Sequence, residues 1–376
     1  MNIREVQAKS LLRKQKKVDS WFLSSYGMNL YRGCTHNCIY CDGRAETYNV
    51  DGEFGKDISV KVNVIDLLSR ELNPARKRKP INKGFFVVGG GVCDSYQPVE
   101  TKYELTRSAL KLLLKYNHPV HMLTKSILIL RDMALLKQIN ERSCVIVSMS
   151  FSSVDDKLSS IIEPGVPPPS KRLETLAKFK EEGITCGMFL MPIIPFITDS
   201  PTQLENTVRA AKEYGLDYVV FGGMTLKEGR QKEYFINILK RHYPQFLIEY
   251  DMLYPPDKWG NAIPAYYEQL NQLFFSIALK HKIPLRIPVL GLRNFFDENN
   301  FIIIILEHLD YISKLKNQSS PFGYAAYSVS QLDKPLSSMR ANLCSIKGVG
   351  KFTEKIILEI LETGSCERYK ELFLIR

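Results

Sequence analysis

Residues 28–41 read Met-Asn-Leu-Tyr-Arg-Gly-Cys-Thr-His-Asn-Cys-Ile-Tyr-Cys. A short apolar run at 28–32 leads into a loop that holds Cys34, Cys38 and Cys41 within eight positions. Three thiolates on one loop can bind three irons of a cubane cluster and leave the fourth iron without a protein ligand. The spacing therefore predicts a four-iron four-sulfur (4Fe–4S) site with one iron free to take a substrate.

Zinc is the alternative metal for this loop. His36 or another side chain would then be the fourth ligand, because structural zinc sites fill all four positions with protein. The other five of the eight cysteines are scattered through apolar stretches. This distribution is more typical of a metal site than of a disulfide framework.

Strand-like and helix-like patterns alternate outward from the loop. Each of six short apolar runs precedes an amphipathic, helix-like stretch, and these runs are 28–32, 85–88, 120–124, 144–149, 186–191 and 218–221. Six such units predict an α/β fold in which a parallel sheet curls into a partial (β/α)6 barrel. Catalytic groups of such barrels lie where strands end and loops begin.

The pattern weakens after Tyr254, through two prolines and a helix expected near 264–280. We expect a basic N-terminal extension at 1–25, the barrel with its C-terminal elaboration at 26–290, a linker near 290–302, and a small all-α domain at 302–376.

The net charge of the 376 residues is +11, and it is concentrated near the N-terminus. Residues 1–83 have sixteen Lys and Arg against nine Asp and Glu, with basic runs at 13–17 and 76–79. Such runs can neutralise phosphates, and a solvated surface is the alternative explanation. We expect a cytoplasmic protein without a membrane span, because no run of about 18 apolar residues occurs and the charged start lacks a secretory signal.

Further motifs make the chain resemble the radical S-adenosylmethionine (SAM) superfamily and, within it, the spore photoproduct lyase-like branch of DNA repair enzymes. The resemblance runs from about Ala8 to Tyr218 and includes, in the branch's order and spacing, 58–63, Thr124-Lys125, Ser148, 163–165 and Arg172-Leu173. It implies that SAM chelates the open iron and that a reductant such as flavodoxin or ferredoxin supplies an electron. The resulting 5'-deoxyadenosyl radical would abstract hydrogen from the substrate.

Candidate SAM contacts follow three strands. Glycines after the second strand let the backbone approach a ligand closely, although a tight turn is the alternative reason for them. The resemblance implies a lysine at the methionine carboxylate and a serine at the ribose. The candidates are Gly89, Gly90, Gly91, Lys125 and Ser148, with Ser150, on the same face of its strand, as a fallback.

The residue that returns hydrogen to the product differs from the family pattern. The spore enzyme family has a cysteine at the end of the second strand, helped by tyrosines beside the cluster cysteines. Gly91 stands at that cysteine position here, and Asp42 replaces one tyrosine. A shift of two residues along a strand keeps the same face, so Cys93 is the candidate donor. The alternative is that Cys93 is only a small residue packed at the strand end. The other candidates are Tyr40 and Tyr96.

Residues 343–357 read as apolar helix, glycine hairpin and apolar helix, and resemble the helix-hairpin-helix module. With 321–327 and Gly364, the segment resembles the N-terminal domain of family X DNA polymerases, whose lyase lysine falls here at Ile356. Glycines at a helix start expose N–H groups that can bind a DNA phosphate. We therefore expect nucleic acid to contact Lys347, Gly348, Gly350 and Lys351.

These features predict a radical SAM enzyme that abstracts hydrogen from a nucleic acid, with lyase-like DNA repair as its role. The main alternative is a radical SAM enzyme for a peptide or small metabolite, with the helical segment as scaffold or dimer contact. A zinc-stabilised nucleic-acid-binding protein without catalysis is the third class.

Overall fold

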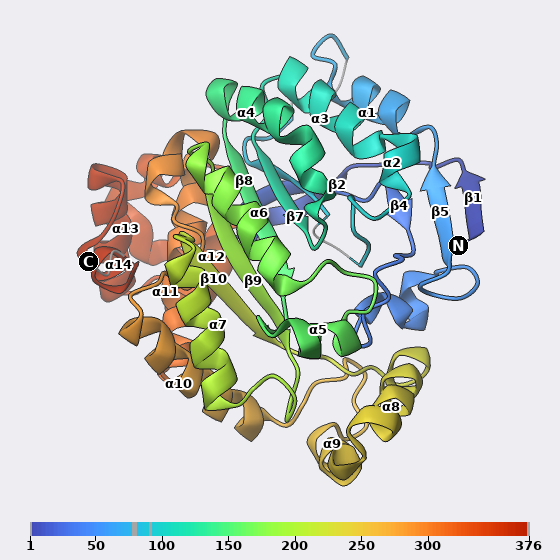
Figure 1. Ribbon diagram of the computed structural model, residues 1–376. Coiled ribbons are helices and arrows are strands. Elements are labelled where there is room, and N and C mark those ends of the chain that lie inside the picture. The colour runs from blue at the N-terminus through green and yellow to red at the C-terminus, as the bar shows by residue number, and fades with distance from the viewer. Residues whose placement is uncertain (1, 77–80, 90–91, 374–376) are drawn as a thin grey trace.

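A computed structural model describes residues 2–76, 81–89 and 92–373 (Figure 1). Its main sheet has seven strands in the order β10-β9-β8-β7-β6-β3-β2. Six strands run parallel, and β2 is antiparallel to β3 at one edge. The strands are β2 (Arg13–Asp19), β3 (Ser24–Met28), β6 (Phe85–Val88), β7 (Val120–Thr124), β8 (Val145–Phe151), β9 (Thr185–Ile193) and β10 (Tyr218–Gly223).

The sheet curls into a half-barrel, which confirms the predicted fold class (Figure 1). Helices between the strands cover its outer face: α1 (Val64–Leu72), α3 (Leu105–Lys115), α4 (Met133–Arg142), α6 (Pro169–Glu181) and α7 (Pro201–Glu213). Shorter helices are α2 (Glu100–Tyr103), α5 (Asp156–Ile162) and α9 (Leu247–Leu253), and α8 spans Arg230–His242. Among the described helices, none is long and apolar enough to cross a bilayer.

The first parallel strand of the main sheet differs from the expected one. The structure places it at β3, Ser24–Met28, rather than at 28–32. The sequence pattern did not predict this strand because Ser24 and Ser25 are polar, yet both residues are buried. Tyr31–Arg32 instead forms β4 of a small sheet with β5 (Asp57–Lys61) and β1 (Asn2–Val6).

Residues 2–19, expected as a basic extension, thus contribute two strands, β1 and β2. The second expected basic run, 76–79, lies mostly outside the described residues.

The C-terminal helices pack on the β2 edge of the half-barrel (Figure 1). Helix α11 (Glu298–Leu315) contacts both β2 and α10 (Pro264–Lys280). Its residues 301–306 are all buried, as expected for a helix that is covered on all sides. The chain then forms α12 (Phe322–Val329), α13 (Lys351–Thr363) and α14 (Glu367–Phe373). A truncation at residue 302 would remove most of α11, so point substitutions are the better probe of this segment.

Two buried histidines should make the fold sensitive to acid. Burial lowers the pKa of His121 to about 4 and the pKa of His308 to about 3. The unfolded chain takes up these protons near pH 6.5, whereas the folded chain does so only at the lower pKa values. The contribution of these two histidines to the free energy of unfolding is therefore fully present above about pH 6.5. It is lost as the pH falls toward 4 and 3.

Between pH 6.5 and 4, the free energy of unfolding of a His121→Gln variant should fall by about 3 kcal/mol less than that of the wild type. Urea unfolding at several pH values measures this loss. The matched control is His242→Gln, since His242 is exposed in α8. Identical pH dependence in the His121 variant and the wild type would contradict the prediction.

Candidate active site

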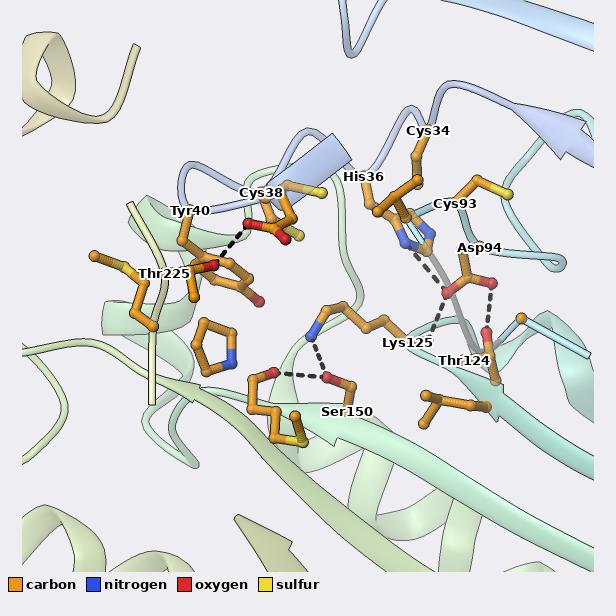
Figure 2. A pocket seen from close by; sticks show the side chains of 18 of the residues that line it. Cys34, His36, Cys38, Tyr40, Cys93, Asp94, Thr124, Lys125, Ser150 and Thr225 are labelled. Carbon is orange, nitrogen blue, oxygen red and sulfur yellow. Dashed lines mark hydrogen bonds and ion pairs between the residues drawn. The ribbon is translucent and has the colours of Figure 1, made fainter. Parts of the chain in front are cut away.

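A pocket of about 340 Å³ lies at the carboxyl ends of the parallel strands (Figure 2). The cysteine loop forms one wall, and all three of its cysteines line the cavity. The opposite wall comes from residues at the ends of successive strands, namely Gly89, Lys125, Ser150, Met191 and Thr225. The motifs predicted from separate parts of the sequence therefore meet at one cavity.

Two glycines allow the cysteine loop to take its shape. Gly33 has a φ of +80°, and a Cβ there would lie 2.4 Å from the carbonyl oxygen of Asp57. A Cβ at Gly165 would lie 2.5 Å from the carbonyl oxygen of Thr35. The Gly165 N–H donates to the His36 carbonyl at 3.0 Å. The segment after α5 thus supports the loop by a backbone contact that only glycine permits.

The three sulfurs form a donor set that fits a 4Fe–4S cluster. Burial raises the pKa of Cys34 and Cys41, and raises the pKa of Cys38 to about 12. Thiolates in such a site need the positive charge of bound iron. Among the described residues, no three His, Cys, Asp or Glu side chains converge on one metal ion, whereas each thiolate of a cubane binds its own iron.

Lys125 is fixed at the pocket by a buried ionic network. Its Nζ donates to the Ser150 hydroxyl at 2.8 Å, as Figure 2 shows. The same Nζ pairs with Glu163 at 3.0 Å. Glu163 also pairs with Arg172 at 2.6 Å and accepts from the Tyr40 hydroxyl. Burial alone would raise the pKa of Glu163, but the charges of Arg172 and Lys125 outweigh it and lower that pKa. A cation is thereby held where an anionic ligand group could meet it.

Replacing Glu163 by Ala should destabilise the fold by about 3–5 kcal/mol, because the fully buried Arg172 would lose its partner. Urea unfolding measures this effect. The matched control is Glu174→Gln, which removes an exposed pair with Lys171 and should cost under about 1 kcal/mol. Equal stabilities of the two variants would contradict the prediction.

Asp94, for which the sequence predicted no role, organises the loop after β6. Its carboxylate accepts from the Thr124 hydroxyl at 2.6 Å and from the Lys125 N–H at 2.7 Å. It also lies 3.4 Å from the His36 ring, as Figure 2 shows. Asp94 therefore joins the loops after β6 and β7 to the cysteine loop.

Cys93 lines the same pocket as the three cysteines of the loop. Its thiol is buried and donates to the Tyr31 carbonyl at 3.3 Å. Burial raises the pKa of Cys93 to about 12. The side chain is therefore a protonated thiol at neutral pH, the form that has a hydrogen atom to give.

Two predicted site residues lie outside the pocket. Ser148 is fully buried and hydrogen-bonds to His121 at 2.6 Å and to Tyr218 at 2.7 Å. Ser148 and Ser150 share a face of β8, but two residues span about 7 Å along a strand. Ser148 therefore lies further from the pocket than Ser150, inside the half-barrel. Tyr96 is also buried, and its hydroxyl donates to Asp132 at 3.1 Å.

The predicted glycines divide between described and undescribed residues. Gly89 lines the pocket with a φ of +89°, and a Cβ there would lie 2.2 Å from the Leu123 carbonyl oxygen. Gly90 and Gly91 lie outside the described residues.

Sequence reasoning missed a polar group at the other side of the pocket. Asp42, next to Cys41, accepts from the Thr225 hydroxyl at 2.8 Å and pairs with Lys227. Asp42 and Thr225 line the cavity. Nothing in the sequence links residues that far apart; the curl of the sheet brings the loop after β10 to the cysteine loop.

A half-barrel with three thiols on a loop at its mouth is the architecture of an iron–sulfur enzyme. Residues 28–204 match the Radical SAM superfamily. An uncharacterised protein of Methanocaldococcus jannaschii is 32% identical over 224 residues, which are 59% of this chain and 78% of that protein. An uncharacterised protein of Mycobacterium tuberculosis is 29% identical over 283 residues, 74% of this chain and 81% of the relative. The chain belongs to the radical SAM superfamily, and its cofactors are a 4Fe–4S cluster and SAM.

Among solved structures, spore photoproduct lyase complexed with dinucleoside spore photoproduct has a TM-score of 0.55 at 16% identity. The alignment covers 74% of this chain and 79% of that chain. A variant of that lyase with bound AdoMet and dinucleoside spore photoproduct has a TM-score of 0.52 at 18% identity, over 72% of this chain and 78% of the variant. Identities this low show a shared fold.

Proposed function

We propose that this enzyme acts on nucleic acid and repairs a DNA lesion by chemistry of the spore photoproduct lyase type. The observation that carries this proposal is the protonated Cys93 thiol, which faces the same pocket as the three loop cysteines. The shared fold with a lyase of a dinucleoside lesion supports it. When bound, the cluster and SAM supply a 5'-deoxyadenosyl radical that abstracts a hydrogen atom.

The residues of the pocket divide between holding the cofactors and serving the substrate. Cys34, Cys38 and Cys41 ligate the cluster. Lys125, held by Ser150, meets the methionine carboxylate with its ammonium group, and the backbone at Gly89 lies close enough to the cavity to hydrogen-bond the methionine end. Ser150 takes the ribose-binding role in place of Ser148, because Ser148 is enclosed by His121 and Tyr218.

Cys93 returns hydrogen to the product in this proposal. Its S–H bond breaks homolytically, the hydrogen atom goes to the substrate radical, and a sulfur radical remains on Cys93. One electron from the flavodoxin or ferredoxin and one proton from solvent then restore the thiol. Tyr40 lines the same pocket and is the tyrosine placed to assist. Tyr96 does not reach the cavity from its position against Asp132.

The glycine hairpin before α13 binds the DNA backbone. Gly348 takes a φ of +83°, and Gly350 precedes the first turn of α13 with nothing within 4 Å of a Cβ built on it. The N–H groups of this turn are therefore open to a phosphate. Lys347 and Lys351 flank the turn, although Lys351 pairs with Glu354 at 2.9 Å. A flavodoxin or ferredoxin serves as reductant.

Anaerobic incubation with SAM, a reductant and UV-irradiated DNA, followed by mass spectrometry of digested nucleosides, tests the proposal. We expect a nucleoside product that depends on SAM and on irradiation. Release of 5'-deoxyadenosine without any change to nucleosides would contradict it and favour a peptide or small-metabolite substrate.

A further inference from the structure

A second groove, of about 920 Å³, lies between the edge strand β2 and helix α11. All seven residues of β2 line it. Trp21 and Arg286 lie on its wall, and Gly323 in the first turn of α12 does as well. The cofactor pocket shares none of these residues, so the groove is a separate site.

The groove has an excess of positive charge. Six Lys and Arg line it against three carboxylates. Two of those carboxylates are already paired, Glu307 with Lys17 and Asp310 with Lys314. Three exposed cations of β2, Arg13, Lys14 and Lys16, form no ion pair with any carboxylate of the described chain.

Arg286 is a buried cation at this groove. Its side chain is 2% exposed, and its guanidinium lies 3.9 Å from the Trp21 ring and 3.4 Å from the Tyr311 ring. Its hydrogen bond to a main-chain carbonyl, that of Leu285, is long at 3.4 Å, and no described carboxylate pairs with it. The buried Tyr311 hydroxyl has this same guanidinium as its polar neighbour. The carboxylate of Asp19, which lines the same groove, acts on this guanidinium without a direct ion pair. A buried cation in this setting favours an anion beside it.

Helix α12 links the groove to the hairpin surface, since Gly323 lines the groove and the next residue contacts the hairpin. Tyr324, next to Gly323, is exposed and stacks with the exposed Tyr327 at a ring distance of 6.4 Å. Lys347 of the hairpin lies 5.9 Å from the Tyr324 ring, and a Cβ at Gly348 would lie 2.3 Å from that ring. Exposed aromatic rings beside cations are what single-stranded bases bind by stacking.

The direction of β2 relates the groove to the cofactor pocket. Arg13 pairs with Gly27 near the carboxyl end of β3, whereas Asp19 pairs with Ser24 at its start. The pocket lies at the carboxyl ends of the strands. The cations of β2 therefore extend toward the same edge of the sheet as the pocket.

The geometry points to a second nucleic-acid site: the groove between β2 and α11 binds the phosphodiester backbone of a strand whose bases stack on Tyr324 and Tyr327. Arg286 and Tyr311 take a phosphate, because a guanidinium can donate two parallel hydrogen bonds to it. The inference rests on the proposed function, since both need nucleic acid as the partner. The stacked tyrosines favour nucleic acid over an acidic peptide.

The test is fluorescence anisotropy of the reconstituted full-length protein with labelled 20-nucleotide single-stranded and duplex DNA over a range of salt. The groove variant is Arg13→Glu/Lys14→Glu/Lys16→Glu, which changes exposed side chains only. We expect it to weaken the affinity for single-stranded DNA at least ~10-fold. The slope of log affinity against log salt concentration should also become less steep by about 2, because each phosphate that is no longer neutralised changes this slope by about 0.7. Arg286→Gln should also weaken binding, with unchanged helicity as proof of folding.

The matched control is Lys111→Glu/Lys178→Glu/Lys212→Glu, which makes the same charge change on exposed residues of α3, α6 and α7. It should retain wild-type affinity, and equal losses in both triple variants would overturn the inference.

Two further results separate the inference from the proposed function. Wild-type affinity in the groove variant, with loss in a Lys347→Glu/Lys351→Glu variant, overturns the inference and leaves the proposed function standing. No binding of DNA by the wild type overturns both. Competition by polyglutamate as effective as that by DNA would overturn the nucleic-acid assignment in favour of an acidic protein partner.

Discussion

Replacement of Cys34, Cys38 or Cys41 by Ala should abolish both the brown absorbance of the reconstituted protein and the release of 5'-deoxyadenosine from SAM. Each thiol lines the pocket, and a cubane needs all three to leave one iron open for SAM. Absorption spectra, iron and sulfide content, and chromatography of the nucleoside product measure the loss. We expect activity to fall below detection, since the cofactor itself is lost.

The matched control is Cys344→Ala, because Cys344 is exposed in the C-terminal segment. It should retain the cluster and full 5'-deoxyadenosine release. A loop variant that still forms 5'-deoxyadenosine at the wild-type rate would sink the assignment of these ligands.

Replacement of Cys93 by Ala should leave SAM cleavage intact but strongly lower the yield of correct product, because the substrate radical loses its hydrogen donor. Without the thiol, the substrate radical stays unquenched and gives altered adducts or uncoupled 5'-deoxyadenosine. In heavy water the thiol exchanges its proton, so the wild-type product should contain deuterium delivered by Cys93. Mass spectrometry of the product measures both effects.

Cys144→Ala is the control for the Cys93 variant, because Cys144 is buried but lies outside the pocket. It should make normal product. Normal product at a normal rate from the Cys93 variant would leave Tyr40 as the donor, or mean that the protein returns no hydrogen.

The two lysines of the hairpin and the cations of β2 were both predicted from the sequence as possible phosphate contacts, but the sequence did not show which of them already have a partner. Lys351 pairs with Glu354, three residues away, whereas Arg13, Lys14 and Lys16 lie on a strand edge. A count of charges in the sequence does not distinguish a paired lysine from an unpaired one. Only the pairing in the folded chain shows which cations are available to a polyanion.

Local patterns determined most of the sheet. Five of the six expected strands match β6 to β10 within two residues. A buried parallel strand is a continuous apolar run, and such a run can be recognised from the strand's own residues. The cysteine spacing likewise predicts the cluster-binding loop, since its candidate ligands are neighbours in the chain. The exception was β3, where Ser24 and Ser25 are buried by tertiary packing and have no apolar signal.

The sequence by itself thus determined the half-barrel and the loop with three cysteines, because both depend on residues close together in the chain. The tertiary structure decided how deep each side chain lies and which distant segments meet. It placed Ser148 below the pocket and Ser150 on its wall, although the two share a strand face. It also brought Asp42 to Lys227 and β2 to α11, since the closure of a curved sheet sets such contacts and no local periodicity encodes them.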